Sequence, residues 1–148
     1  MTGAYFITVC TIDRAPILGT ILPSAEGEAA KNCLSAFGAI TDAEVRALPQ
    51  RYPYVQIEHS VVMPNHVHLL ISVMDTVTKE QRIAIPQIVG VWKSRVTQLC
   101  KAHGYSGKRI FQQSFYEHVV RDERDYQKIW TYIEDNPQNW ATDCYYTD

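Results

Sequence analysis

Four segments of the chain alternate apolar and polar residues or form short apolar runs, which predicts four β-strands. They cover residues 5–12, 54–62, 66–73 and 111–120. Met63, Pro64 and Asn65 alone separate the second segment from the third. Because such a short connection permits only a hairpin turn, we expect these two strands to pair antiparallel.

Apolar residues that recur every three or four positions predict three helices. The first two cover residues 24–40, after a loop that carries Gly19, and residues 86–103. The third opens at Asp122, with acidic residues in its first turn, and ends at Pro137. This order of elements predicts an α+β fold, a ferredoxin-like split βαβ arrangement with an antiparallel sheet and an extra C-terminal helix.

Length and composition predict one domain over residues 1–148, because 46% apolar and 20% charged residues are typical of an ordinary globular protein. No apolar run approaches the roughly 20 residues that span a bilayer. The N-terminal stretch shows no basic leader before a long apolar segment. The four cysteines are scattered, which disfavours a zinc cluster or a disulfide framework. We therefore expect a cytoplasmic protein with no membrane partner.

Charge is unevenly distributed, although the net charge is only −2. Between residues 91 and 121, Glu117 is the one acidic residue. The basic residues of this stretch are Lys93, Arg95, Lys101, Lys108, Arg109 and Arg121. On charge alone, a patch that guides a phosphate backbone and a solvated helix face and loop explain the stretch equally well.

His66 and His68 are one residue apart in a predicted strand, so both imidazoles should point to the same side of the sheet. That arrangement supplies two ligands for a metal ion. Val67 should face the opposite way, with Leu69 and Ile71, so that the strand buries one face and presents the histidines on the other. The alternative is a pair of surface histidines with no role.

Three other polar residues are harder to place. Strand alternation puts Glu117 and His118 on opposite faces, so only one of them can look toward the histidine pair. His118 is either an accessory metal or phosphate ligand or a hydrogen-bonded structural histidine. His59 alternates with Ile57 and Val61 on the face expected to be buried, and we assign it no function.

Two of the nine tyrosines stand out as candidate nucleophiles, Tyr116 in the last predicted strand and Tyr132 on the last helix. At about 100° per residue, Tyr132 falls outside the stripe of that helix expected to be buried, and Asn136 lies on the same flank as Tyr132. The stripe consists of Tyr126, Ile129, Trp130 and Ile133. The alternatives are a boundary tyrosine at position 132 and a helix C-cap at Asn136, before Pro137.

Residues 63–68, Met-Pro-Asn-His-Val-His, resemble the HUH motif of the single-tyrosine transposases (transposase IS200-like family), in particular the REP-associated tyrosine transposase branch. The resemblance continues through residues 5–8, 110–121, 125–126 and 132–137. Matched segments therefore occur in order over most of the chain, and several separated motifs are more specific than any one of them.

The resemblance implies an enzyme that nicks and rejoins DNA through a 5′-phosphotyrosine intermediate, with Tyr132 as the nucleophile. It also implies that His66, His68 and Asn136 hold a divalent metal ion, Mg²⁺ or Mn²⁺. Asn136 stands where many relatives have glutamine, and its shorter side chain leaves direct ligation open. Family members are monomers or dimers that exchange the tyrosine helix, and both states, including a homodimer, remain open for this chain.

The expected partner is single-stranded DNA that carries a hairpin beside a short recognition sequence. The candidate residues for contact with its backbone are Lys93, Arg95, Lys108, Arg109 and Arg121. Two other functions compete with the transposase hypothesis. One is a domesticated protein that binds hairpin DNA but is catalytically silent, and the other is a metal-binding ferredoxin-like domain that acts on small molecules.

Overall fold

A four-stranded antiparallel sheet organises the protein, and its strand order is β4-β5-β1-β6. The computed structural model describes residues 3–22, 29–74, 78 and 83–146. The strands of the sheet are β1 (Gly3–Cys10), β4 (Val55–Met63), β5 (His66–Val73) and β6 (Tyr116–Val119). A separate two-stranded ribbon pairs β2 (Gly19–Leu22) with β3 (Lys31–Leu34).

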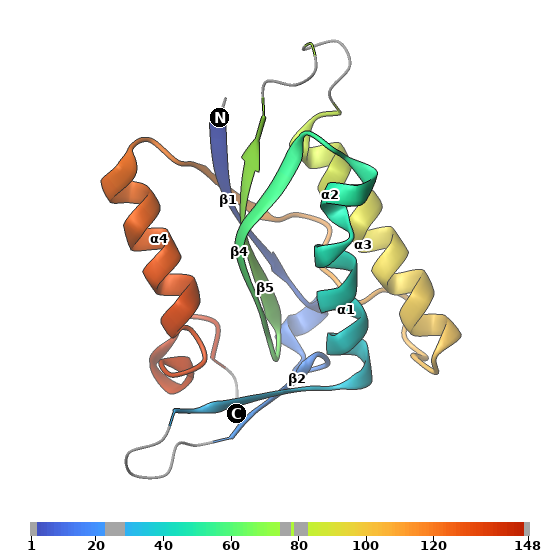
Figure 1. Ribbon diagram of the computed structural model, residues 1–148. Coiled ribbons are helices and arrows are strands. Elements are labelled where there is room, and N and C mark those ends of the chain that lie inside the picture. Colours follow the sequence, from blue (N-terminus) through green and yellow to red (C-terminus); the bar gives the residue numbers. More distant parts are fainter. Residues whose placement is uncertain (1–2, 23–28, 75–77, 79–82, 147–148) are drawn as a thin grey trace.

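Helices cover both faces of the sheet (Figure 1). They are α1 (Ala36–Arg46), the short α2 (Leu48–Arg51), α3 (Ile85–Ala102) and α4 (Glu123–Asp135), and two 3-10 turns cover Ile12–Arg14 and Trp140–Thr142. Figure 1 shows α4 alone on one face, with α1 and α3 together on the other. The expected ferredoxin-like α+β architecture with an extra C-terminal helix is therefore confirmed.

Two hydrophobic cores bury the central strand β5 from both sides. The larger core lies under α1 and α3, where Val67, Leu69 and Ile71 meet Trp92 and Val96. The smaller core lies under α4, where Leu70 meets Ile129 and Ile133 and is flanked by Phe6 and Val61. Every residue of β5 is buried.

The helix predicted over residues 24–40 is largely wrong. Residues 24–28 lie outside the described part of the chain, residues Lys31–Leu34 form a strand, and the helix begins at Ala36. Ser35 starts it, because its hydroxyl accepts a hydrogen bond from the Gly38 amide at 3.1 Å. The preceding segment, expected to be a loop, contains strand β2.

A β-bulge in β4 overturns the prediction that Ile57 and Val61 share a face. Ile57 pairs with Ile71 and His59 with Leu70, so Glu58 is the extra residue. After the bulge the alternation is inverted. Ile57 therefore packs on the large core, whereas Val61 packs under α4.

The other predicted elements agree with the structure to different degrees. The strands expected at 54–62 and 66–73 and the helix expected at 86–103 lie within one residue of the observed bounds. The last strand is shorter than expected, because Phe111 forms only an isolated bridge to Thr11 before β6 begins.

None of the helices in the described ranges is long and apolar enough to cross a membrane. The cytoplasmic location stays a prediction.

Candidate metal and nucleophile site

The two histidines of β5 lie on the α4 side of the sheet, and their ring centroids are 4.5 Å apart. They are not presented to solvent as expected, because His66 is 0% and His68 1% exposed. The segment after α4 covers them. The ring of Trp140 stacks 6.1 Å from that of His66, and the ring of Tyr145 lies 4.5 Å from it.

Asn65 determines which nitrogen of His66 carries the hydrogen. The Asn65 amide nitrogen donates to the carbonyl oxygens of Tyr145 at 2.7 Å and Arg14 at 3.3 Å, so its oxygen faces His66 Nδ1 at 2.8 Å. Nδ1 must therefore be the donor. Burial lowers the pKa of His66 to about 4 against the opposing effect of Asp143. His66 is therefore neutral at pH 7, with a lone pair on Nε2.

His68 is arranged in a similar way. Its Nδ1 lies 2.8 Å from the Thr8 hydroxyl of the neighbouring strand. Thr8 also hydrogen-bonds the phenol of Tyr145. Burial raises the pKa of this phenol, and the bond to Thr8 lowers it in part. Burial and the neighbouring His66 hold the pKa of His68 well below its usual value. Within the described part of the chain, His68 Nε2 is buried without a hydrogen-bond partner.

Asn136 closes the site from the end of α4. Its backbone caps the helix, and its side-chain oxygen lies 3.2 Å from Nε2 of His66. With the His66 hydrogen on Nδ1, these two atoms both present lone pairs to each other. Asn136 is therefore the C-cap of α4 with its side chain beside His66, and its ligation of a metal stays a prediction.

These three atoms fit a divalent cation. Nε2 of His66 and Oδ1 of Asn136 present lone pairs to each other, Nε2 of His68 has no hydrogen-bond partner among the described residues, and a buried polar atom left unpaired costs about 1–3 kcal/mol. Among the described residues, no three His, Cys, Asp or Glu side chains converge as a metal site. The third protein donor would thus be an amide oxygen. Two imidazole nitrogens suit Mn²⁺ better than Mg²⁺, which prefers oxygen.

Tyr132 lies beside the histidines and is 39% exposed. Its ring centroid is 5.1 Å from that of His68, and its hydroxyl donates to Oδ2 of Asp143 at 2.9 Å. Burial and this contact with Asp143 raise the pKa of Tyr132 well above its usual value. Ile129 and Ile133 of the expected stripe are buried, whereas Trp130 is 37% exposed.

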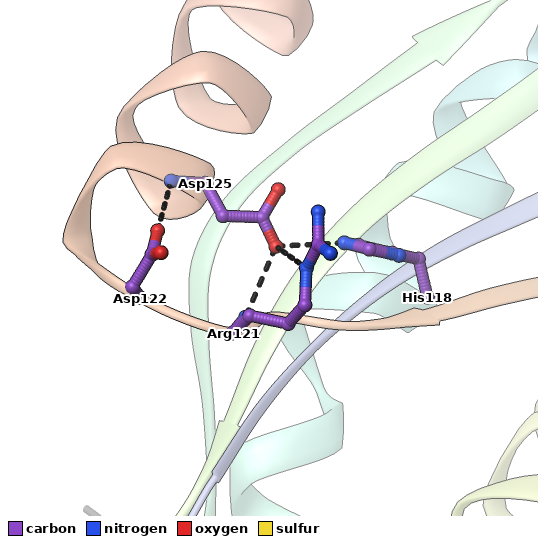
Figure 2. Close-up of polar contacts among 4 residues, drawn as sticks. All are labelled: His118, Arg121, Asp122 and Asp125. Carbon is purple, nitrogen blue, oxygen red and sulfur yellow. Dashed lines mark hydrogen bonds and ion pairs between the residues drawn. The ribbon is translucent and has the colours of Figure 1, made fainter.

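The accessory candidates separate as strand alternation predicts. His118 pairs with Phe6, on the α4 side, whereas Glu117 pairs with Ile7, whose side chain belongs to the large core. His118 Nε2 donates to Oδ2 of Asp125 at 2.7 Å. Figure 2 shows the same carboxylate oxygen bonded to Arg121, while Asp122 caps α4. The alternative of a hydrogen-bonded structural histidine accounts for His118.

His59, to which the sequence assigned no role, packs against α4. Its ring stacks on that of Trp130 with centroids 4.4 Å apart, and its Nε2 donates to Glu134 at 2.8 Å. These contacts join the edge strand β4 to α4, the helix that carries Tyr132.

The five basic residues expected to contact DNA do not share one surface. Lys93 and Arg109 line a surface pocket of about 580 Å³ together with Lys101. Arg95 is held by Glu44 of α1 at 3.0 Å. Arg121 lies beside α4, on the other side of the sheet, and is 3.9 Å from the Asp125 carboxylate. Lys108 is exposed and does not line the pocket.

Several residues of the site could not be identified from the sequence. The most important is Asp143, whose carboxylate bonds both Tyr132 and Asn136. Trp140 and Tyr145, which cover His66, were also missed. All three follow Pro137 in a segment without helical or strand periodicity. Only its density of aromatic residues indicates that it packs against something.

The chain was compared with protein families, curated proteins and solved structures. No protein-family model matches the chain. An uncharacterised protein of Haemophilus influenzae is 28% identical over 162 aligned positions, which cover 99% of this chain and 86% of that protein.

Two solved structures are similar. One is a REP-associated tyrosine transposase bound to a REP hairpin, with a TM-score of 0.66 and 21% identity over 91% of this chain and 66% of that one. The other is a candidate transposase from Deinococcus radiodurans, with a TM-score of 0.50 and 19% identity over 89% of this chain and 88% of that one. The chain thus spans about two thirds of the first transposase. These similarities show that the chain has the fold of a REP-associated tyrosine transposase.

Proposed function

We propose that this chain is a transposase of the REP-associated, single-tyrosine HUH type, a metal-dependent enzyme that nicks and rejoins single-stranded DNA beside a hairpin. One observation carries the proposal. A partly exposed tyrosine, Tyr132, lies against the ring of His68, which is paired with His66, and the Nε2 atoms of both histidines meet no donor among the described residues. The hairpin bound to the similar transposase supports the choice of substrate.

The metal ligands proposed here are Nε2 of His66, Nε2 of His68 and Oδ1 of Asn136. A bound divalent ion would act as a Lewis acid on a non-bridging phosphate oxygen, which is worth several kcal/mol. Asn65 and Thr8 orient the two rings through their Nδ1 atoms, at 2.8 Å in each case. Such partners commonly determine ring orientation and ligand strength.

Tyr132 is the proposed nucleophile. Its phenolic oxygen forms a bond to phosphorus while the bond from phosphorus to the 3′ oxygen breaks. The phenol gives up its proton and the departing oxygen gains one. The product is a 5′-phosphotyrosine and a free 3′ hydroxyl, and the reverse attack by such a hydroxyl rejoins DNA without ATP. Because burial and Asp143 keep the phenol protonated, this proton must leave during the attack.

Access to the site requires movement of the C-terminal segment. His66 and His68 are 0% and 1% exposed, with Trp140 and Tyr145 against the His66 ring. A phosphate therefore reaches Nε2 of His66 only when these aromatic rings move aside. Tyr132 already reaches the surface, at 39% exposed.

The pocket lined by Lys93, Lys101 and Arg109 is the proposed contact for the DNA backbone. Gln112, one of the residues that line this pocket, is anchored to β1. Its backbone N–H donates to the Cys10 carbonyl oxygen at 2.9 Å. Cys10 in turn pairs with His66. The basic pocket thus adjoins the end of the sheet at which the metal would bind. Positive side chains there would neutralise phosphates in a salt-dependent manner.

A second candidate function is a hairpin-binding protein that does not cut. The observation in its favour is the complete burial of both histidines beneath the C-terminal segment. It predicts DNA binding that persists in EDTA, without cleavage under any metal tested. A domain that acts on small molecules would instead fail to bind single-stranded DNA at low salt.

The test is an incubation of the protein with Mn²⁺ and an end-labelled single strand that carries a hairpin. The proposal predicts a protein–DNA band that survives denaturation, requires the metal and disappears in Tyr132→Phe. The matched control is Tyr116→Phe, because Tyr116 is also exposed and lies near Phe6. If Tyr116→Phe abolishes the band and Tyr132→Phe retains it, the assignment of the nucleophile is wrong.

A further inference from the structure

Hydrogen bonds from Tyr145, Tyr132 and Asn136 hold the carboxylate of Asp143. Its Oδ1 accepts from the backbone amide of Tyr145 at 2.8 Å. Its Oδ2 accepts from the Tyr132 hydroxyl at 2.9 Å and from the amide nitrogen of Asn136 at 2.8 Å. One oxygen atom therefore contacts both the proposed nucleophile and a proposed metal donor.

This contact determines which way the Asn136 amide points. An asparagine amide can be turned by half a rotation, which exchanges its acceptor oxygen and its donor nitrogen. Next to the lone pair of His66 Nε2, the intrinsically favoured orientation would present the nitrogen, because it could then donate a hydrogen bond. The structure has the opposite arrangement, with the oxygen 3.2 Å from Nε2. An ionised carboxylate only accepts hydrogen bonds, so Asp143 binds the nitrogen and leaves the oxygen toward the histidine.

We propose that Asp143 is a positioning residue that keeps the Asn136 amide oxygen turned toward His66 and thereby keeps the site open to a metal cation. The inference rests on the proposed function, in which Asn136 is a metal donor. Without the carboxylate, the amide nitrogen would donate to His66 Nε2 and occupy the lone pair that the metal needs. Asp143 itself contacts no metal in this proposal and acts through Asn136.

Asp143→Asn isolates this role from the local fold. The asparagine oxygen can still accept from the Tyr145 amide, so the turn at this position is retained. Its nitrogen then replaces Oδ2 and cannot accept from Asn136, which turns the Asn136 amide. The double variant Asp143→Asn with Asn136→Asp reverses the effect. A carboxylate at position 136 presents acceptors to both the asparagine nitrogen and His66.

The experiment measures Mn²⁺ affinity of the full chain by calorimetry. Asp143→Asn should weaken binding about tenfold or more, as loss of an outer-shell partner commonly does, and the double variant should recover most of that loss. The matched control is Asp135→Asn, which removes the same charge from an exposed position one residue from Asn136 and should bind as the wild type does. Thermal unfolding of the metal-free proteins confirms that each variant folds.

A second measurement does not depend on metal binding. Long-range ¹⁵N–¹H spectra of the metal-free protein report whether His66 Nε2 accepts a hydrogen bond. Asp143→Asn should shift the Nε2 resonance as a hydrogen bond from Asn136 forms, and Asp135→Asn should not. An unchanged Nε2 resonance in Asp143→Asn overturns the proposal.

Unchanged Mn²⁺ affinity in that variant, with affinity lost in His66→Ala, also overturns it and leaves the proposed function standing. Failure of the wild type to bind Mn²⁺ refutes the proposed function, and the spectra still decide the orientation of the amide.

Discussion

Oδ1 of Asn65 accepts the Nδ1 hydrogen of His66 at 2.8 Å, and this bond leaves Nε2 of the ring with its lone pair directed into the site. The two residues are neighbours in sequence, at the turn between β4 and β5. Asn65 is itself fixed by the carbonyl oxygens of Arg14 and Tyr145. Asn65, in the turn, therefore determines the tautomer of His66, the first proposed metal ligand.

Asn65→Ala should lower the free energy of unfolding by about 1–3 kcal/mol, because it leaves the buried His66 Nδ1 hydrogen without its acceptor and the partly buried Tyr145 carbonyl oxygen without its donor. Urea denaturation measures the effect. Asn139→Ala is the control, because Asn139 is exposed and its side chain does not cap the turn that follows it. Equal stability losses in the two variants would contradict the role assigned to Asn65.

The histidine site was only partly predictable from sequence. Period-two alternation places His66 and His68 on one side, and the helical wheel places Tyr132 and Asn136 on one flank, since both regularities are local. The burial of the histidines was not predictable, because it depends on how the segment after Pro137 folds back. Asp143 belongs to that segment, and no periodicity indicates its contact with Tyr132.

The fold, too, has parts that local sequence patterns predict and parts that they do not. The central strand and its hairpin were predicted because β5 and β4 are adjacent in sequence and strongly patterned. The bulge at Glu58 was not predicted, because a single extra residue leaves the apolar composition of the strand unchanged. The helix expected at 24–40 was misplaced because helix-forming alanine and glutamate residues precede Ser35 in the sequence, whereas the Ser35 cap starts the helix at Ala36.

Gly38→Ala should destabilise the protein by about 2 kcal/mol or more, as overpacking at an unyielding contact commonly does. A Cβ at Gly38 would lie 1.9 Å from the carbonyl oxygen of Leu18, so backbone would have to move. The matched control is Gly90→Ala in α3, where nothing lies within 4 Å of the added carbon. Gly90→Ala should stabilise by about 0.5–1 kcal/mol through helix propensity. Thermal unfolding distinguishes the two, and similar effects would contradict the packing of α1 on the Leu18 backbone.

Glu44 should make stability depend on pH. Burial raises the pKa of Glu44, but hydrogen bonds from Arg51 and Arg95 at 2.9 and 3.0 Å lower it by more, so the pKa lies below its usual value. A depressed pKa stabilises the folded state at pH values above the unfolded pKa of about 4.3, and this contribution is lost as pH falls through the folded pKa.

Glu44→Gln should therefore lower stability by about 1 kcal/mol at pH 7, and the difference from wild type should shrink below pH 4. Urea denaturation at a series of pH values measures this difference. A difference that grows as the pH falls would contradict the sign. Asp42→Asn is the control, because Asp42 makes a more exposed pair with Arg46 on the same helix.

Basic residues should separate into structural and DNA-binding classes. Lys101→Ala and Arg109→Ala, which alter the basic pocket, should each weaken binding to hairpin DNA and reduce the salt slope by about one. Arg95→Ala should leave the salt slope unchanged and instead lower stability, because Arg95 is paired with Glu44. Fluorescence anisotropy at several salt concentrations measures both. An equal change of slope in all three variants would contradict the proposed path of the DNA.

Mass spectrometry of the covalent complex identifies the residue that attacks the DNA. The full chain is incubated with Mn²⁺ and hairpin DNA, the nucleic acid is digested to a short remnant, and the peptides are sequenced. Tyr132 should carry a nucleotide attached through its 5′ phosphate, and no other tyrosine should carry one. A nucleotide on a different residue, or cleaved DNA with no covalent peptide, would contradict it.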